Sequence, residues 1–144
     1  MKFHFITVGA PKLEYAKLGW DEYYKRLGRF HQLKTTRISD KKATDDALLA
    51  AAGDRAYVIA LDLQGQEIES EGIAVRMDSL AISGVSEVAF IIGGPDGFGE
   101  KVRKKADALW KLSTLTLPHD LAMIVMLEAL YRGSTINAGV PYHR

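Results

Sequence analysis

The sequence has no cysteine among its 144 residues. This absence excludes a disulfide-stapled secreted scaffold, a metal cluster held by thiolates and a cysteine nucleophile. Long hydrophobic runs are also missing: the longest, residues 121–127, is far short of the about 20 residues that cross a bilayer. No apolar stretch with a small-residue cleavage site follows Met1. We therefore expect a cytoplasmic protein with no membrane partner.

An excess of charge of one sign is missing too. Lys and Arg number 19 and Asp and Glu 18, for a formal net charge of +1. Proteins that hold nucleic acid usually have a basic footprint, so this balance at first argues against a phosphate-rich partner. A metal is not expected either, because His4, His31, His119 and His143 lack the spacing of metal ligands.

What the sequence does contain is a regular alternation of short apolar or β-branched runs with helical stretches. Strands are expected over residues 2–8, 33–38, 56–61, 87–92 and 112–117, and helices over 13–30, 41–52, 68–82, 100–109 and 120–136. Continuously apolar central strands are typical of a mostly parallel sheet with helices on both faces. The prediction is an α/β fold with one doubly wound domain spanning residues 1–144.

In such sheets ligands bind beyond the carboxyl ends of the strands, which points to residues 62–66, 93–99 and 116–120. Residues 93–99 hold four glycines in seven positions, so their backbone can approach a ligand closely. The segment is neither a P-loop nor a dinucleotide fingerprint. A tight turn with Asp96 as a local cap is the plain alternative.

Residues 112–120 form the second candidate segment, in which Ser113, Thr114 and Thr116 interleave with leucines. Asp120 is placed to cap the N-terminus of the last helix. A lone histidine at a strand–helix junction is more often structural than catalytic. His119 is expected to lie beside the glycine loop, and this position makes it a candidate catalytic residue.

The last four residues, Pro141, Tyr142, His143 and Arg144, form the third candidate. A frayed end is the plain interpretation. Yet each of the four has a property useful in a site. Proline has a fixed φ and tyrosine an aromatic ring, histidine ordinarily titrates near neutrality, and arginine can donate two hydrogen bonds to a phosphate.

The last expected helix is apolar around its whole circumference over residues 121–127. A helix that covers one face of a sheet needs only an apolar stripe, so this helix is expected to be buried on two sides. In a chain of this size, a second subunit related by a two-fold axis is the simplest cover, and we expect a homodimer.

Several segments together resemble one known family. IIGGPDGFG, then LSTLTLPH, an apolar helix ending in LEALYR and the final PYHR are similar to the bacterial ribosomal RNA large subunit methyltransferase H family. This family is a minimal branch of the SPOUT methyltransferases. The resemblance covers essentially the whole chain, and the order and spacing of the motifs carry it.

The resemblance implies a C-terminal trefoil knot, an obligate dimer, S-adenosylmethionine as methyl donor and methylation of N3 of a pseudouridine in 23S ribosomal RNA, on assembled ribosomes. By match to the family motifs, the donor pocket would be lined by Leu61, Gly93, Ser113, Thr114, Leu115, Thr116, Leu117 and Pro118. Tyr142, His143 and Arg144 would complete the active site over the partner's cofactor. Tyr142 would stack on the substrate or position it, and Arg144 would anchor it. Either His143 or His119 would relay the proton.

The chain departs from the family pattern at two places in the last helix. Met123 stands where an arginine is common, which weakens the expectation that substrate is held there. Gly133 and Ser134 replace an alanine–aromatic pair, and we expect this change to loosen the end of the helix. Another SPOUT enzyme acting on transfer RNA or another ribosomal nucleotide, and a non-catalytic knotted dimer that binds RNA or ribosomes, remain alternatives.

The near-zero net charge is a cancellation between segments. Residues 1–42 hold ten basic and four acidic groups, residues 43–100 hold two and eleven, and residues 101–144 hold seven and three. Lys41, Lys42 and the basic groups at 101 and 103–105, duplicated in a dimer, are candidates for an RNA-facing surface. Solvated helix faces are the plain alternative.

Overall fold

The computed structural model describes residues 1–143, which form a five-stranded sheet with the order β2-β1-β4-β3-β5. All of its strand pairs are parallel. The elements follow one another as β1 (Lys2–Val8), α1 (Glu14–Leu27), β2 (Gln32–Ile38), the 3-10 turn η1 (Asp40–Lys42), α2 (Asp45–Ala52), β3 (Tyr57–Glu67), α3 (Ser70–Ile82), β4 (Glu87–Ile92), α4 (Glu100–Lys105), β5 (Ala108–Lys111) and α5 (His119–Ala138). The predicted α/β class is confirmed.

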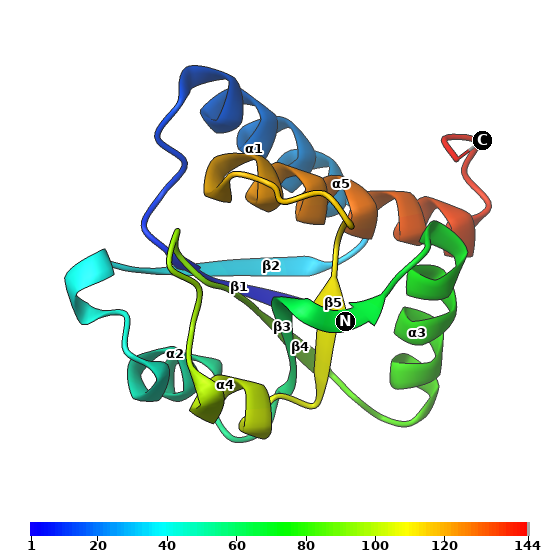
Figure 1. The fold of residues 1–144 in the computed structure, drawn as a ribbon. Coiled ribbons are helices and arrows are strands. Elements are labelled where there is room, and N and C mark those ends of the chain that lie inside the picture. Colours follow the sequence, from blue (N-terminus) through cyan, green and yellow to red (C-terminus); the bar gives the residue numbers. More distant parts are fainter. Residues whose placement is uncertain (144) are drawn as a thin grey trace.

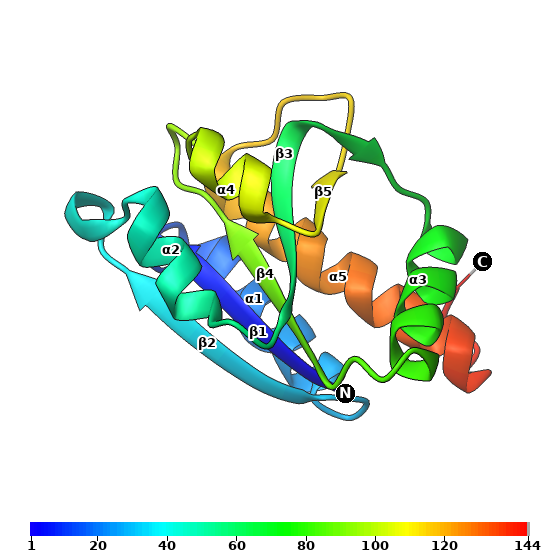
Figure 2. The ribbon, with the colours of Figure 1, turned by 90° about the horizontal axis from the view of Figure 1, so that it is seen from below.

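Helices cover both faces of the sheet, α1 and α5 on one and α2 and α4 on the other (Figures 1 and 2). Successive strand residues point to opposite faces, so each central strand supplies two cores. In β1, Phe3 and Phe5 join the core under α1 and α5, whereas Ile6 joins the core under α2 and α4. In β4, Phe90 and Ile91 divide in the same way. This double coverage explains the continuously apolar strands of the sequence.

The expected strand over residues 112–117 and the expected helix up to residue 109 are both wrong. α4 ends at Lys105, and β5 begins at Ala108. Asp107 sets this boundary, because its backbone N–H donates to the Val58 carbonyl (2.8 Å) and its carboxylate accepts from the Val58 N–H (2.7 Å). These bonds place the following residues in register beside β3 and leave 112–118 as a loop.

Asp120 does not cap α5, contrary to expectation. The helix begins one residue earlier, at His119, and no side chain caps it. The buried Asp120 carboxylate instead accepts from the backbone N–H groups of Lys12 (2.8 Å) and Leu13 (2.7 Å). It thereby fixes the entry of α1 against the first turn of α5.

α5 packs closely on α1 and α3 through two glycines. A Cβ at Gly19 would lie 3.1 Å from Ile124, and one at Gly133 would lie 2.8 Å from Ile73. The expected loosening at Gly133 and Ser134 is not seen, since α5 continues to Ala138 and both residues are buried. Met123 is fully buried in the core.

Within residues 1–143, no helix combines the length and apolar character needed to cross a membrane.

Candidate active site

A pocket of about 380 Å³ lies where the middle of β3 meets the loops after β4 and β5. The expected loop over residues 62–66 is wrong, because β3 continues to Glu67. The pocket is lined by residues 61–64 and 92–98, by Arg103, Trp110 and Ala122, and by six of the residues 112–119. This is the carboxyl edge of the sheet, where the sequence places the candidate loops. The volume falls within the usual range for small-molecule sites, about 300–1,000 Å³.

The pocket gathers most of the residues proposed from sequence. Those that line it are Leu61, Gly93, Ser113, Leu115, Thr116, Leu117 and His119. Thr114 and Pro118 are exposed and do not line it. Sequence reasoning missed Trp110, which it left between a helix and a strand, and the role of Asp62 and Arg103 as a pair.

An irregular stretch of β3 shapes one wall. Trp110 of β5 faces both Leu61 and Gln66, so residues 62–65 arch out of the ladder between these two positions. Gly65 permits the arch, because a Cβ there would lie 2.7 Å from the Leu109 backbone. The arch carries Asp62 to the pocket, with the buried Trp110 indole beside it.

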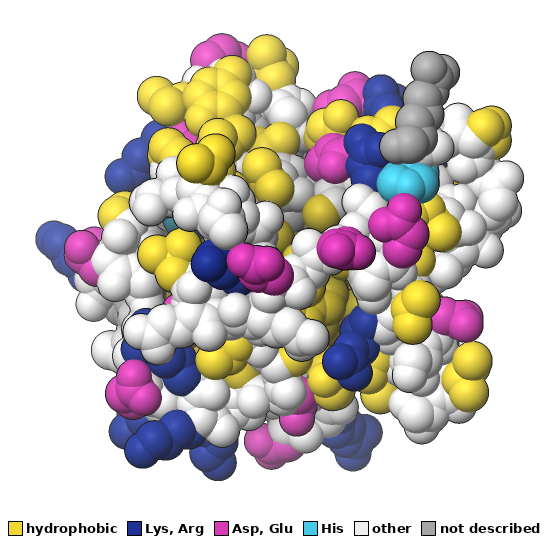
Figure 3. Space-filling model, turned by 45° about the vertical axis from the view of Figure 1, so that its right-hand side comes forward, with side chains coloured by type: hydrophobic (Ala, Val, Ile, Leu, Met, Phe, Trp, Pro, Cys, Tyr) yellow, Lys and Arg dark blue, Asp and Glu magenta, His cyan; other side chains and the backbone are white. Residues whose placement is uncertain are grey.

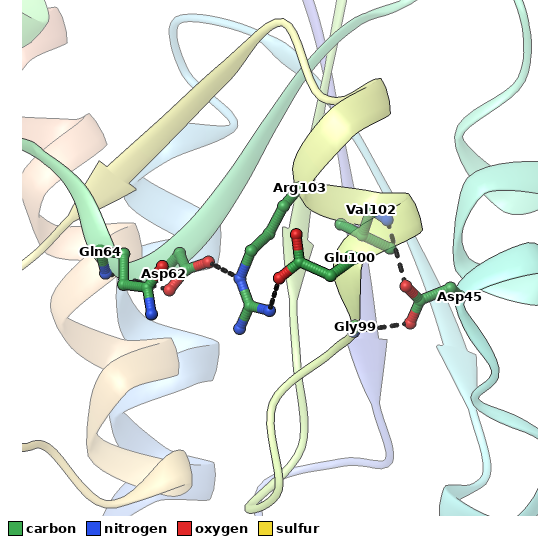
Figure 4. A network of polar contacts seen from close by, with 7 residues as sticks. All are labelled: Asp45, Asp62, Gln64, Gly99, Glu100, Val102 and Arg103. Atoms are coloured by element: carbon green, nitrogen blue, oxygen red, sulfur yellow. Dashed lines mark hydrogen bonds and ion pairs between the residues drawn. The ribbon is translucent and has the colours of Figure 1, made fainter.

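The glycine loop forms the opposite wall as a tight turn. The Gly97 N–H donates to the Gly94 carbonyl at 2.8 Å, and Gly97 has a φ of 72°. Asp96 contributes no cap to α4. Asp45 of α2 does so from across the fold, accepting from the N–H groups of Gly99 (2.8 Å) and Val102 (3.1 Å), as Figure 4 shows.

Arg103 braces the two walls (Figure 4). Its Nε donates to the Asp62 carboxylate, and its Nη1 donates to Glu100 at 2.9 Å. Its guanidinium also lies 5.5 Å from the centre of the Phe98 ring, in the glycine loop. The bond to Asp62, followed by the bond to Glu100, raises the pKa of Arg103. The side chain therefore couples the arch of β3 to the loop after β4.

His119 lies at the floor of the pocket in a defined tautomer. Its Nε2 is 3.1 Å from the Val8 carbonyl oxygen. A carbonyl only accepts, so Nε2 is the donor of this bond, and in the neutral ring the lone pair is on Nδ1. The neutral form of the ring can therefore accept a proton at Nδ1.

None of residues 139–143, the described residues after α5, lines the pocket of its own chain. The Tyr142 hydroxyl donates to Glu128 at 2.8 Å, and His143 Nε2 is 2.9 Å from Glu71 Oε1. A bond to its own backbone and then the bond to His143 lower the pKa of Glu71. Glu128 is nine residues along α5 from His119, a rise of about 14 Å. Arg144 lies outside the described residues.

Two of the basic residues that were candidates for an RNA-facing surface form ion pairs with acidic residues of the same chain. Lys101 pairs with Asp46 at 3.2 Å, and Arg103 belongs to the pocket wall. Among residues 1–143, no cluster of three or more histidine or acidic side chains is arranged to hold a metal ion.

Comparison with known proteins identifies the class of enzyme to which this fold belongs. A family model described as "Predicted SPOUT methyltransferase" matches residues 1–143. A solved structure of a methylase family protein from Haemophilus influenzae superposes with a TM-score of 0.55 at 14% identity, over 96% of this chain and 66% of that one. At that identity the superposition shows a shared fold only.

Full-length relatives narrow the class further. Proteins named ribosomal RNA large subunit methyltransferase H are 51% identical in Deinococcus deserti, 52% in Deinococcus radiodurans and 40% in Streptococcus agalactiae. Each alignment covers 100% of this chain and at least 99% of the relative. The chain therefore belongs to the ribosomal RNA large subunit methyltransferase H family of SPOUT methyltransferases, and the C-terminal trefoil knot comes with that family.

Proposed function

We propose that this chain transfers a methyl group from S-adenosylmethionine to N3 of a pseudouridine in the 23S RNA of the large ribosomal subunit, on assembled ribosomes. The observation that carries the proposal is the pocket at the carboxyl edge of β3, β4 and β5, in a chain with full-length relatives named for this RNA.

The pocket residues fit such a donor. Leu61, Ile92, Trp110 and Leu117 offer apolar surface for an adenine ring. Gly93 lets the loop close tightly, since a Cβ there would lie 3.0 Å from the Gly97 backbone. Bound there, S-adenosylmethionine supplies an electrophilic methyl group on a sulfonium.

The chain's own residues then have to orient the base and remove its N3 proton. That proton is only weakly acidic, so transfer needs a positioned base together with in-line alignment of the nucleophile. His119 Nδ1 fills the role of base, because Nε2 is committed to Val8 and holds the ring in place. The methyl group would pass from the sulfonium sulfur to N3, breaking the S–C bond as the N3–C bond forms, and His119 Nδ1 would take the N3 proton. Of the two histidines that the sequence left open, the proposal takes His119 because it lines the pocket.

A second copy of the chain completes the site in this proposal. Leu13, Tyr15 and Leu18 of the α1 region are 56%, 50% and 63% exposed, and Leu121 and Val125 of α5 are half-buried. Figure 3 shows apolar side chains gathered on the side of the molecule occupied by α1. An apolar patch of this kind marks an interface. We place the two-fold axis of a homodimer there, so that the partner's His143 approaches the pocket.

The test of substrate is methyl transfer from labelled S-adenosylmethionine. We expect acceptance by assembled ribosomes and large-subunit RNA that contains pseudouridine, and none by the same RNA transcribed with uridine. RNA mass mapping of cells lacking the gene, with and without complementation, locates the methyl group. An unchanged methylation pattern, or acceptance by transfer RNA instead, contradicts the assignment. Equilibrium sedimentation that shows only monomer at micromolar concentration contradicts the dimer.

The test of the base is His119→Ala. Loss of a general base costs about 100-fold or more in single-turnover rate. We expect this loss while the calorimetric affinity for S-adenosylmethionine stays unchanged. His31→Gln is a control, since His31 lies outside the residues that line the pocket. A His119→Ala protein with the wild-type rate across pH contradicts histidine base catalysis at this position.

A further inference from the structure

The segment after α5 is held by a cluster of aromatic and charged side chains. Residues 139–143 leave the end of α5 and turn back on the side of the molecule where α5 and α3 lie (Figures 1 and 2). Glu128 and Arg132 of α5, Tyr131 between them, Tyr23 of α1 and Tyr142 make up this cluster, which we call the tail latch. The tail itself is residues 139–143.

Tyr142 is the only tail residue that enters the latch among those the structure describes, and it makes contacts of three kinds. Its hydroxyl donates to Glu128 Oε2 at 2.8 Å and lies 3.5 Å from the Tyr23 hydroxyl. Its ring meets the Tyr131 ring edge-on, with centroids 4.7 Å apart. The Arg132 guanidinium lies 4.8 Å from the Tyr142 ring centre.

Glu128 joins these contacts into one unit. The same oxygen, Oε2, that accepts from Tyr142 also accepts from Arg132 Nη2 at 2.7 Å. A hydrogen bond to a carboxylate that is itself paired is stronger than a neutral one. Burial, followed by the bonds to Tyr23 and Glu128, raises the pKa of Tyr142, so the hydroxyl keeps the proton that it donates.

The latch leaves Tyr142 unavailable to stack on a substrate base. Its ring lies between Tyr131 and Arg132, and its hydroxyl is already bonded. Of the described tail, His143 is then the residue that can bring chemistry to a partner's site. It follows Tyr142 directly, and its Nε2 lies 2.9 Å from Glu71 Oε1, so the anchored Tyr142 and this contact together hold it.

We propose that Glu128 is a positioning residue that acts through the Tyr142 hydroxyl, anchoring the tail so that His143 is presented at a fixed place to the partner's pocket. The inference rests on the proposed function, because it gives the tail a part in methyl transfer. It assigns Tyr142 to anchoring instead of base stacking, and it gives Glu128 and Arg132 a role that the pocket does not require.

The experiment is a double-mutant cycle with Tyr142→Phe and Glu128→Ala. Each change is expected to lower the single-turnover rate of methyl transfer to ribosomes about ten-fold, with calorimetric affinity for S-adenosylmethionine unchanged. The double variant is expected to lose about ten-fold as well, because both changes break the same bond. Tyr142→Phe keeps the ring and its packing, so it remains informative even where Glu128→Ala lowers stability.

A matched control comes from another paired glutamate. The Glu87 side chain is 24% exposed and lies 3.3 Å from Lys2, against 26% for the Glu128 side chain and 2.7 Å to Arg132. Glu87→Ala is expected to leave the rate unchanged. A wild-type rate in Tyr142→Phe overturns the proposal, because a stacking ring needs no hydroxyl. A loss near 100-fold in the double variant overturns it as well.

Hydrogen–deuterium exchange of residues 139–143 tests the latch without any methyl transfer. Tyr142→Phe and Glu128→Ala are expected to speed exchange there about five-fold or more, while Glu87→Ala leaves it unchanged. Unchanged exchange in both latch variants overturns the inference. Where the wild-type protein transfers no methyl group to any RNA, the proposed function fails, and the exchange data still decide whether the latch anchors the tail.

Discussion

His31 makes the stability of the fold depend on pH in a direction that can be worked out. Its ring stacks on Phe3 with centroids 4.0 Å apart, and its Nε2 donates to Ser134 Oγ at 2.9 Å. Burial, with the Met1 amino group as the second cause, lowers the pKa of His31 from 6.5 to about 4. The unfolded chain therefore takes up a proton before the folded one does. Stability that is fully present above pH 6.5 is lost as the pH falls toward 4.

The magnitude follows from the two pKa values. A difference of about 2.5 between folded and unfolded states corresponds to about 3 kcal/mol once both pKa values have been passed. The ring is only partly buried, so water screening reduces this to roughly half. Between pH 7 and pH 5 we expect His31 to remove about 1 kcal/mol from the free energy of unfolding.

Urea unfolding at pH 7, 6 and 5, followed by tryptophan fluorescence, measures this loss in the wild-type protein and in His31→Gln. The wild type is expected to lose about 1 kcal/mol more than the variant over that interval. Burial, foremost, also lowers the pKa of His4, so His4→Gln serves as the control and keeps the His31 contribution. Parallel curves for the wild type and His31→Gln, or an NMR titration of His31 near 6.5, contradict a lowered pKa of His31 in the folded protein.

Three further substitutions test how the site is built. Gly65→Ala places a Cβ about 2.7 Å from the Leu109 backbone; we expect a loss of about 2 kcal/mol in urea unfolding and weaker calorimetric binding of S-adenosylmethionine. Arg103→Ala removes the brace to Asp62, and we expect about ten-fold weaker binding of the same ligand with Tm changed by only a few degrees, whereas unchanged affinity contradicts a brace. Asp120→Ala leaves two backbone donors without their acceptor, and we expect a loss of about 2–3 kcal/mol in urea unfolding; Asp120→Asn should retain part of it.

Sequence patterns predicted the central part of the fold well because burial there is two-sided. β1 and β4 read as continuous apolar runs, and their bounds, Lys2–Val8 and Glu87–Ile92, are those expected. The strand at the edge of the sheet was predicted less well from the sequence. Residues 112–117 alternate leucine with serine and threonine, as a half-buried strand does, but here the alternation lines a pocket. The strand that pairs with β3 is set by Asp107, whose partner Val58 is 49 residues away.

The candidate site was predictable where it depends on strand ends and unpredictable where it depends on long-range pairs. The carboxyl-edge rule directs attention to the edge of the sheet where Leu61, Gly93 and His119 line one pocket. No local pattern shows that Arg103 pairs with Asp62, which is 41 residues earlier, so its charge was read as surface. Apolar periodicity also carries no signal for a knot, because threading of the chain leaves no period in the sequence.

The pairing inside the chain changes what the basic residues can do for RNA. A cation already bound to a carboxylate releases fewer counterions when a phosphate approaches, so it adds less to affinity than a count of Lys and Arg suggests. Of the four basic groups of α4, Lys101 and Arg103 are paired with Asp46 and Asp62. Lys104 and Lys105 are the basic residues of this helix without such a pair among the ion pairs of the described residues. The homodimer proposed above would double these cations, and under that proposal shape and symmetry, more than net charge, are expected to select the substrate.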